Sequence, residues 1–247
     1  MNGPGARGPG RTVIVGDVHG CRAELEDLLD KVGFGDGDRL YLTGDLVSRG
    51  PDSPGVIALA RRLGAAAVRG NHEEKLLRWH AARRSGLPPE PLGDMHRQVA
   101  RSLRREHWDY LGRTPLWLDL PEHGVRLVHA GVVPGVAIEH QSRRTLLTVR
   151  SLGPAGEPLE RPGGTPWASR YYGPPHVVFG HYAQREPQLH ASATGIDTGC
   201  VYGGELTAMV LRSGEQVPPP DERRDLLVRV LARRRYFGSG KAYGEKR

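Results

Sequence analysis

Three segments in the first third of the chain decide the fold: RTVIVGDVHG (11–20), DRLYLTGDLVSRG (38–50) and AAAVRGNHE (65–73). Each begins with a short apolar run typical of a buried strand and ends in a glycine-containing turn that carries polar side chains. Helical spacing of apolar residues follows each turn, first in 21–32, then in 56–64, and a third time from NHEEKLL onward. This βαβαβα order predicts a parallel sheet flanked by helices, with ligands bound beyond the carboxyl ends of its strands.

The pattern changes in the second half of the chain. A Pro-rich break and a polar helical stretch, within about 80–113, predict a small helical cap over the site. Short strand-like runs follow: LWLDL (116–120), VRLVHAG (125–131), HVVFGH (176–181), TGIDTG (194–199) and ELTAMVLRS (205–213). They predict a second sheet packed on the first. The expected fold is therefore α/β, with two packed mixed β-sheets flanked by helices.

The two ends of the chain differ from its body. Residues 1–10 (MNGPGARGPG) have no apolar core of a secretory signal and are interpreted as a flexible leader, and 11–215 as the folded domain. For 216–247 we expect a basic C-terminal helix, over 221–235, and a loose tail. Such a helix would pack its apolar side chains and leave its arginines in water.

The composition of the 247 residues sets limits on partners and location. The net charge of +7 indicates a solvated basic surface and suits anionic substrates such as polyphosphates, nucleotides or phosphoproteins. No RNA- or DNA-binding motif is present, so nucleic acid is not an expected partner. No apolar run is long enough to span a membrane, and the two cysteines, expected to be buried thiols, form no disulfide framework. A cytoplasmic location is the default prediction.

Polar side chains that can bind metal follow five separate strand-like runs. They are Asp17 and His19 in GDVHG, Asp45 in GDLVSRG, Asn71 and His72 in GNHE, His129 in VHAG, and His181 in FGHY. Oxygen and nitrogen donors of this kind suit Mn²⁺, Fe, Zn²⁺ or Ni²⁺ rather than a thiolate-bound metal. A carboxylate between two cations roughly 3.5–4 Å apart would hold a dinuclear centre that acidifies a bridging water. The pattern predicts a metal-dependent hydrolase.

In their order along the chain, GDVHG, GDLVSRG, GNHE, HAG and GH resemble the phosphoprotein phosphatase branch of the calcineurin-like metallophosphoesterases, over roughly 12–212. The resemblance implies an αββα sandwich and two divalent metal ions, with Mn²⁺ favoured and Fe, Zn, Co or Ni possible. It also implies a metal-bridging hydroxide as the nucleophile. By the same resemblance, metal one is bound by Asp17 and His19, Asp45 bridges, and metal two is bound by Asn71, His129 and His181.

The resemblance also implies roles around the phosphate. His72 matches the proton donor to the leaving group, and Arg49 and Arg69 match arginines that clamp the phosphate. Arg170, in WASR, resembles a W-x-x-R element of bacterial members and is either a third clamp or a plain surface arginine. Asp197, in IDTGC, is expected to stabilise its loop. Seven further histidines, His96 among them, lack a strand-end context and are expected to be surface or core residues.

Two substrates fit the same motifs. One reading is symmetrical hydrolysis of dinucleoside polyphosphates, which converts diadenosine tetraphosphate to two ADP; the alternative is a bacterial Ser/Thr or broad-specificity protein phosphatase. Ser48 favours the first, because protein phosphatases read GDxVDRG, with an aspartate that pairs with the proton-donor histidine, whereas the symmetrical hydrolases read GDLVARGP. IDTGCVYGGELTAMVL (196–211) resembles the closing strand of those hydrolases, but Glu73 matches the GNHE of protein phosphatases. A non-catalytic metal-binding interaction module is a third reading, disfavoured by the intact set of His72, Arg49 and Arg69.

Overall fold

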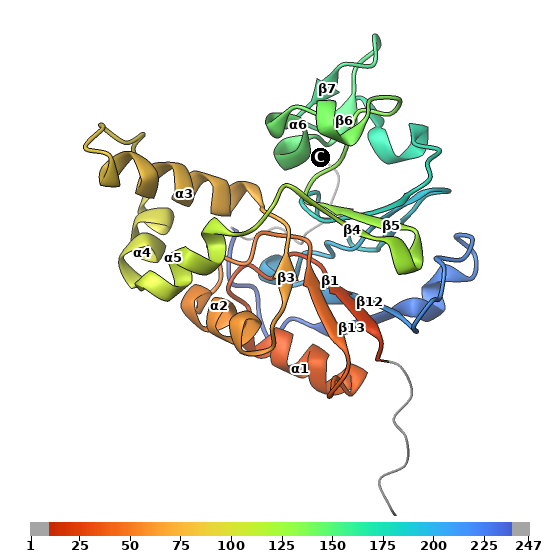
Figure 1. The fold of residues 1–247 in the computed structure, drawn as a ribbon, viewed down its shortest axis with the longest axis horizontal. Helices are drawn as coiled ribbons and strands as arrows, with labels where there is room; N and C mark the ends of the chain where they lie inside the picture. Colours follow the sequence, from red (N-terminus) through yellow and green to blue (C-terminus); the bar gives the residue numbers. More distant parts are fainter. Residues whose placement is uncertain (1–9, 239–247) are drawn as a thin grey trace, which may run out of the picture.

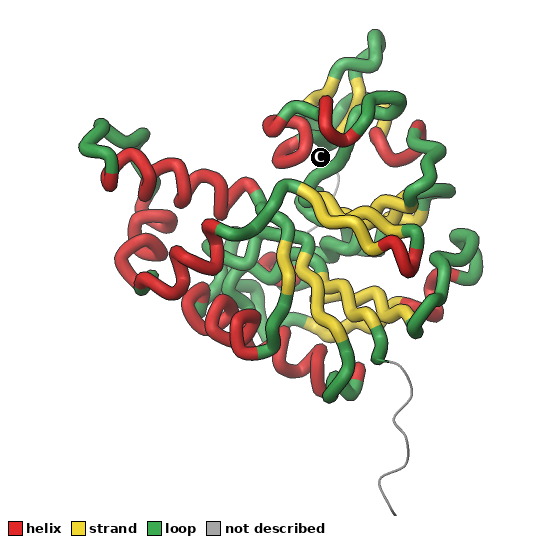
Figure 2. The backbone as a smooth tube through the Cα atoms, viewed as in Figure 1, coloured by secondary structure: helices red, strands yellow, loops and turns green. Residues whose placement is uncertain are grey.

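The computed structural model describes residues 10–238, and its centre is a pair of five-stranded sheets (Figures 1 and 2). The first sheet has the strand order β13-β12-β1-β2-β3, in which β1, β2 and β3 are parallel and β12 and β13 run antiparallel to their neighbours. Its strands are β1 (Thr12–Val15), β2 (Arg39–Leu42), β3 (Ala66–Ala67), β12 (Glu205–Leu211) and β13 (Leu227–Leu231).

The second sheet has the order β10-β11-β9-β5-β4, with parallel pairs only between β5 and β9 and between β9 and β11. Its strands are β4 (Trp117–Leu120), β5 (Val125–Val128), β9 (His176–Phe179), β10 (Gln188–Leu189) and β11 (Ala193–Gly195). A small third sheet, ordered β7-β6-β8, lies outside it and consists of β6 (Ser151–Leu152), β7 (Pro158–Leu159) and β8 (Thr165–Pro166).

The helices lie outside this pair of sheets (Figure 1). The α-helices are α1 (Arg22–Val32), α2 (Ser53–Arg62), α3 (Asn71–Arg84), α4 (Asp94–Ser102), α5 (Arg105–Gly112) and α6 (Arg143–Thr148). Short 3-10 helices are η1 (Pro121–His123), η2 (Ile138–His140), η3 (Trp167–Arg170), η4 (Cys200–Tyr202) and η5 (Arg223–Leu226). Across residues 10–238, none of these helices has the length and apolar character needed to cross a membrane.

Alternation along β1 shows how the sheets pack. Ile14 points into an apolar layer between the two sheets, whereas Val13 and Val15 point the other way, into a core shared with α1 and α2. The layer between the sheets is built from Ile14, Val68, Leu120, Val125, Leu127, Val178, Ile196, Met209 and Leu211. The sandwich of two mixed sheets flanked by helices is therefore confirmed.

The outer face of the second sheet is covered differently from that of the first. Its apolar cluster joins Val128 and Phe179 to side chains of α6 and to Trp167 of η3. Trp167 is fully buried, and its indole Nε1 donates to the Ala130 carbonyl oxygen at 3.1 Å. This layer consists of α6, the 3-10 helices η2 and η3, irregular turns and the small third sheet.

The first-half prediction is confirmed element by element: β1, α1, β2, α2, β3 and α3 follow one another as expected. Within 80–113 the structure has the last turn of α3 and then α4 and α5. Cys21 and Cys200 are free and buried, as expected. The leader assigned to 1–10 lies almost wholly outside the described residues, as does the end of the tail.

The predicted basic helix over 221–235 is wrong. Only η5 is helical there, and 227–231 form β13, which pairs with β12 so that Val228 lies opposite Ala208 and Val230 opposite Leu206. Val228 and Val230 pack toward the helices, whereas Leu227 packs between the sheets. Because the strand packs partly buried apolar side chains on both faces, its apolar residues imitate helical spacing. The folded domain therefore extends past residue 215.

One buried carboxylate fastens the chain after β13 to α1. Glu24, on α1, is fully buried, and its Oε1 accepts from the backbone N–H of Arg233 at 3.0 Å and from the hydroxyl of Tyr236 at 2.7 Å. Around it, Arg233 forms an ion pair with Asp27 at 2.9 Å on the surface. The last described segment is thus held to α1 by part-buried hydrogen bonds to a fully buried carboxylate.

We expect Glu24→Ala to lower the free energy of unfolding by about 1–3 kcal/mol, because it leaves the part-buried Arg233 N–H and Tyr236 hydroxyl without their acceptor. Urea denaturation measures the change. The matched control is Glu26→Ala on the same helix, which removes an exposed pair with Arg22 and should change stability by less than about 1 kcal/mol. Equal losses in the two variants would contradict the fastening role of Glu24.

Candidate metal centre

The turns after β1 and β2 interlock at the carboxyl ends of the two strands. The backbone N–H of His19 donates to the Asp45 carbonyl at 2.7 Å, and that of Gly20 to the Leu46 carbonyl at 2.8 Å. The described non-glycine residues with positive φ all lie in the motifs: His19, Asp45, Ser48, Arg49 and His181. Each such conformation costs of order 1–3 kcal/mol and persists only where its surroundings enforce it, which is typical of functional sites.

Glu73 holds the second turn in this conformation. Its buried carboxylate accepts from the backbone N–H groups of Asp45 (2.8 Å), Val47 (3.2 Å) and Gly70 (2.9 Å). Burial raises the pKa of Glu73 to about 7, with the charge of Asp45 adding to the rise. Glu73 entered the sequence analysis only through its resemblance to GNHE, and its role as a backbone clamp could not be seen there.

Two glycines allow carboxylates to approach the backbone closely. A Cβ atom at Gly180 would lie 1.9 Å from Asp17 Oδ1, and one at Gly70 would lie 2.2 Å from Asp45 Oδ1. No side chain fits at either distance. The glycines of FGH and RGNH are therefore required by the position of the carboxylates.

The donors assigned to metal two are gathered at one point. His129 Nε2 lies 3.0 Å from Asn71 Oδ1 and 3.4 Å from Asp45 Oδ2. His181 Nδ1 lies 3.0 Å from the same Asn71 oxygen. Ligand atoms of Asp45, His129 and His181 all fall within 4.8 Å of one another. Four residues from four separate segments thus present oxygen and nitrogen atoms to a shared space.

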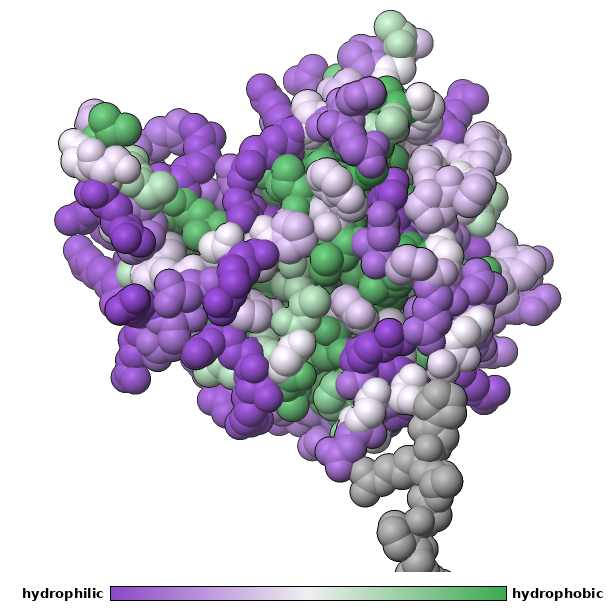
Figure 3. All heavy atoms as spheres, in the orientation of Figure 1, coloured by the Kyte–Doolittle hydropathy of each residue, from purple (hydrophilic) through white to green (hydrophobic). Residues whose placement is uncertain are grey.

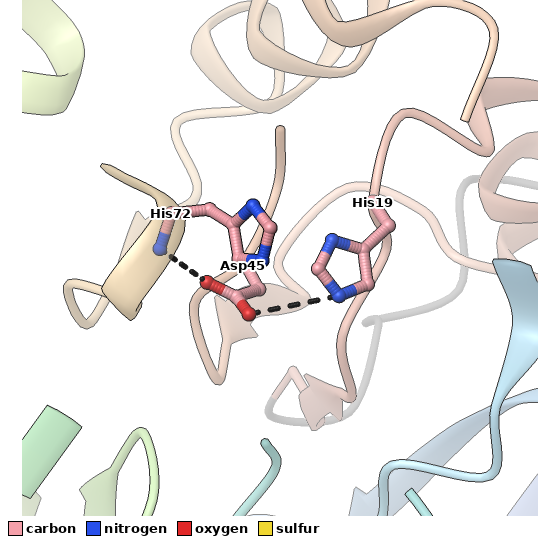
Figure 4. Close-up of side chains that lie close together, drawn as sticks. All are labelled: His19, Asp45 and His72. Carbon is pink, nitrogen blue, oxygen red and sulfur yellow. Dashed lines mark hydrogen bonds and ion pairs between the residues drawn. The ribbon is translucent and has the colours of Figure 1, made fainter. Parts of the chain in front are cut away.

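The donors assigned to metal one adjoin the same carboxylate. His19 Nε2 lies 3.6 Å from Asp45 Oδ2, and Figure 4 shows the Asp45 carboxylate joined by dashed lines to the His19 ring and to the His72 backbone nitrogen. Asp17 is buried beside them, with its oxygens accepting from Thr43 Oγ1 at 3.1 Å and from the His181 backbone N–H at 2.9 Å. Asp45 is therefore placed to serve both donor sets.

Hydrogen bonds fix the orientation of the histidine rings. His19 Nδ1 lies 3.1 Å from the Val47 carbonyl oxygen, and His129 Nδ1 lies 2.9 Å from that of Thr43. A carbonyl accepts, so each Nδ1 carries a hydrogen and each Nε2 is the ring nitrogen that faces the donor cluster. Backbone carbonyls orient metal-binding histidines in this way.

The buried charges require compensation. Burial and the nearby charge of Asp197 hold the pKa of Asp17 well above its usual range, and burial raises the pKa of Asp197 to about 6. Burial opposes the charged form of His129, but Asp45 beside it raises the pKa of that imidazole to about 10. Acids this crowded are stable together when cations lie among them. The donor chemistry and the excess of buried acid fit two divalent ions.

His72 and Arg49 lie where the sequence analysis expects them. The His72 backbone N–H donates to Asp45 Oδ1 at 3.0 Å, and its side chain is buried. Arg49 Nη1 lies 2.7 Å from His19 Nε2. The guanidinium lies 5.5 Å from the centre of the Tyr202 ring and 5.7 Å from that of Phe237. A proton donor and a cation thus border the donor cluster.

Arg69 and Arg170 are not brought to the cluster. Arg69 Nη2 donates to the Thr114 carbonyl at 2.8 Å, and Nη1 lies 3.3 Å from Glu74 Oε2. Arg69 lines a cavity of about 740 Å³ between α3 and α5, which Arg143 of α6 also borders. Figure 3 shows hydrophilic side chains on both sides of the notch between α3 and α6. Arg170 is exposed. The clamp roles of Arg69 and Arg170 stay predictions.

Two basic residues at the site could not be recognised from the sequence. His96, expected to be a surface or core residue, places Nε2 3.0 Å from His72 Nδ1. Arg150 lies 5.6 Å from the ring centre of Tyr182 and has a buried Nε without a hydrogen-bond partner in the described chain. His96 follows no strand and lies in a polar helix, so no local pattern distinguishes it. Asp197 accepts from the Gly199 N–H at 3.0 Å, which confirms the predicted loop role.

A sandwich of two mixed sheets with buried oxygen and nitrogen donors gathered at the carboxyl ends of its strands is the arrangement expected of a metal-dependent phosphoester hydrolase. Comparison with protein families agrees, because residues 10–214 match the calcineurin-like phosphoesterase family. The chain belongs to that family, whose members use divalent metal ions.

Curated relatives carry two kinds of name. The asymmetrical bis(5'-nucleosyl)-tetraphosphatase PrpE of Oceanobacillus iheyensis is 32% identical over 220 residues, which cover 79% of this chain and 86% of the relative. The symmetrical bis(5'-nucleosyl)-tetraphosphatase of Chromohalobacter salexigens is 30% identical. The match covers 83% of this chain and 96% of the relative. That of Shewanella oneidensis is 40% identical over a shorter stretch, 56% of this chain and 51% of the relative.

Solved structures share the fold. A crystal structure of a protein described as a candidate diadenosine tetraphosphatase is 38% identical, with a TM-score of 0.75 and coverage of 90% of this chain and 94% of that one. A Ser/Thr protein phosphatase from Saccharomyces cerevisiae is 15% identical, with a TM-score of 0.57. The match covers 91% of this chain and 80% of that one. The second likeness shows the fold alone.

Adding Mn²⁺ to chelator-treated protein should raise the melting temperature by about 5–10 °C at one hundred times the dissociation constant, because cations bind only the folded donor set. Differential scanning fluorimetry measures the shift. Asp45→Asn should lose more than half of it, since Asp45 serves both donor sets. The control is Asp119→Asn, which alters an exposed pair with Arg126 and should keep the full shift. An undiminished shift in Asp45→Asn would refute the bridging position.

Proposed function

We propose that this chain hydrolyses dinucleoside polyphosphates with two divalent ions, Mn²⁺ by preference, and converts diadenosine tetraphosphate to two ADP. The observation that carries the proposal is Asp45, whose Oδ2 lies 3.6 Å from His19 Nε2 and 3.4 Å from His129 Nε2, between the two donor sets. The substrate class is supported by the names of relatives that match most of the chain. The positive net charge of the chain suits a polyphosphate.

The proposal also specifies which bond of the polyphosphate chain is hydrolysed. Relatives named asymmetrical and relatives named symmetrical both match the chain. Two features support the symmetrical cut: the small Ser48 in the turn after β2 and the closing segment IDTGCVYGGELTAMVL, which resemble the symmetrical hydrolases. The 40% identity to the Shewanella enzyme points the same way.

Different residues of the site have different roles: ion binding, phosphate binding and proton donation. Asp17, His19 and Asp45 would hold one ion, and Asp45, Asn71, His129 and His181 the other. Bound there, the ions supply charge neutralisation on the phosphate and a water acidic enough to attack at neutral pH. Arg49 binds phosphate oxygens, and the two aromatic rings beside its guanidinium limit its movement. His72 gives a proton to the oxygen that leaves phosphorus.

A second candidate function is a protein phosphatase. It is favoured by Glu73 in GNHE, but Glu73 binds three backbone N–H groups, so its presence reflects the shape of the turn as much as the substrate. The non-catalytic reading is disfavoured because His72 and Arg49 both border the donor cluster. Cytoplasmic location stays a prediction from the sequence.

The direct test offers diadenosine tetraphosphate and a phosphoserine peptide to the purified protein with Mn²⁺. We expect the dinucleotide to be consumed faster and ion-exchange chromatography to show ADP alone. ATP together with AMP would refute the symmetrical cut while keeping the substrate. Faster turnover of the peptide would favour the protein phosphatase.

Arg49→Ala should lower kcat/KM for diadenosine tetraphosphate by about 100-fold or more, because a charge-assisted contact to phosphate is lost in both binding and turnover. Metal content, measured by elemental analysis, should stay at two ions per chain. Arg22→Ala, which removes an exposed arginine of α1, should leave both values unchanged. Loss of the ions in Arg49→Ala would show that Arg49 supports the donor set instead.

A further inference from the structure

A cavity of about 740 Å³ begins beside the donor cluster and follows one face of α3. Arg69, two residues before Asn71, lines it at one end, and Ser85, directly after α3, lines it at the other. Figure 1 shows α3 leading away from the sheets, with α5 below it and α6 across from it. The volume lies in the range of cavities that bind small molecules, so this one can hold part of a substrate whose phosphate reaches the metal donors.

Two stacked rings line this cavity. The imidazole of His80, on α3, and the indole of Trp108, on α5, have centroids 4.1 Å apart and an interplanar angle of 6°. Burial, reinforced by the charge of Arg84, lowers the pKa of His80, so the pair of rings is uncharged at pH 7. Flat aromatic surfaces of this kind are the platforms on which proteins stack nucleobases.

The stacked rings lie as far from the metal donors as a bound nucleotide would require. His80 follows Asn71 by nine residues in the same helix, which places it about 13 Å along the helix axis at a rise of about 1.5 Å per residue. An extended nucleoside diphosphate has a similar reach from its terminal phosphate to its base. A base on the stacked rings would therefore leave the terminal phosphate at the donor cluster.

The lining between the rings and the donor cluster is basic. Glu74 joins two arginines there, because its Oε2 lies 2.7 Å from Arg143 Nη2 and 3.3 Å from Arg69 Nη1. A guanidinium has five N–H donors, so each arginine can still bind a phosphate oxygen. Over the whole cavity, four arginines face two acids: Arg69, Arg78, Arg84 and Arg143 against Glu74 and Asp109.

We propose that this cavity binds one nucleoside of the substrate: its nucleobase stacks on the His80–Trp108 pair, and its phosphates pass Arg69 and Arg143 on the way to the metals. The inference rests on the proposed function, because it gives a binding site to one half of a dinucleoside polyphosphate. No bond is made or broken in the cavity. Since every base has a π face, the site selects for the presence of a base more than for its identity.

The test measures inhibition by ADP and by pyrophosphate of diadenosine tetraphosphate hydrolysis with Mn²⁺. Pyrophosphate offers the metals and the arginines the same phosphate chain as ADP but has no nucleoside. Trp108→Ala should weaken inhibition by ADP about 10-fold or more, because one base–aromatic stack is lost, and change inhibition by pyrophosphate less than about 2-fold. Trp108→Phe, which keeps a ring for stacking, should recover most of the loss.

Trp79→Ala is the matched control. Trp79 also lies on α3, with its ring centre 5.0 Å from the Arg83 guanidinium, but it lines a separate cavity of about 440 Å³. Its loss should leave both inhibition constants unchanged. His80→Ala removes the other ring of the pair and should weaken inhibition by ADP alone, which keeps the test decisive if Trp108→Ala does not fold.

The outcomes separate this inference from the proposed function. Unchanged inhibition by ADP in both ring variants, or equal weakening of inhibition by ADP and by pyrophosphate, would overturn the base-binding role and leave the proposed function in place. Failure of the unaltered protein to hydrolyse diadenosine tetraphosphate would overturn the proposed function and, with it, the assignment of the cavity.

Discussion

The burial of four carboxylates at one edge of the sandwich is the constraint on which the rest of this structure depends. Asp17, Asp45, Glu73 and Asp197 are all buried beside the carboxyl ends of the strands. Glu73 is balanced by three backbone N–H groups and Asp197 by one, whereas Asp17 and Asp45 face histidine nitrogens and each other's charge. A protein holds such a group either by protonating some of the acids or with cations among them. The buried donor set therefore fits divalent metal ions.

The fold meets this constraint with a rigid backbone. Interlocked turns place His19 and Asp45 in conformations with positive φ, which side chains adopt only when surrounding bonds enforce them. The apolar layer between the sheets and the core beneath α1 and α2 fix the strand ends from which those turns start. The strain is localised where donor atoms must point inward. Preorganised donors of this kind hold charge without rearranging during reaction.

The sandwich supplies the donors, and the segments around it contact the groups that border the donor cluster. Met95 and His96 come from α4, which belongs to neither sheet, and Arg49 lies against rings from two later segments. The cavity lined by Arg69 and Arg143 lies between α3 and α5 and is bordered by α6. Differences in these segments outside the two sheets can change leaving-group chemistry and substrate while the donor cluster stays the same.

Local pattern by itself determined the first βαβαβα series, the two-sheet class and six donor residues, because each motif directly follows an apolar strand and a glycine turn. Local pattern could not identify β13 as a strand. Apolar residues packed on both faces of a strand can show the same spacing as those of a helix. Nor could local pattern place Arg69, whose guanidinium is taken by Thr114 and Glu74, or single out His96 and the clamp formed by Glu73. Those assignments depend on contacts between residues distant in the chain, and only tertiary packing decides which buried polar groups find each other.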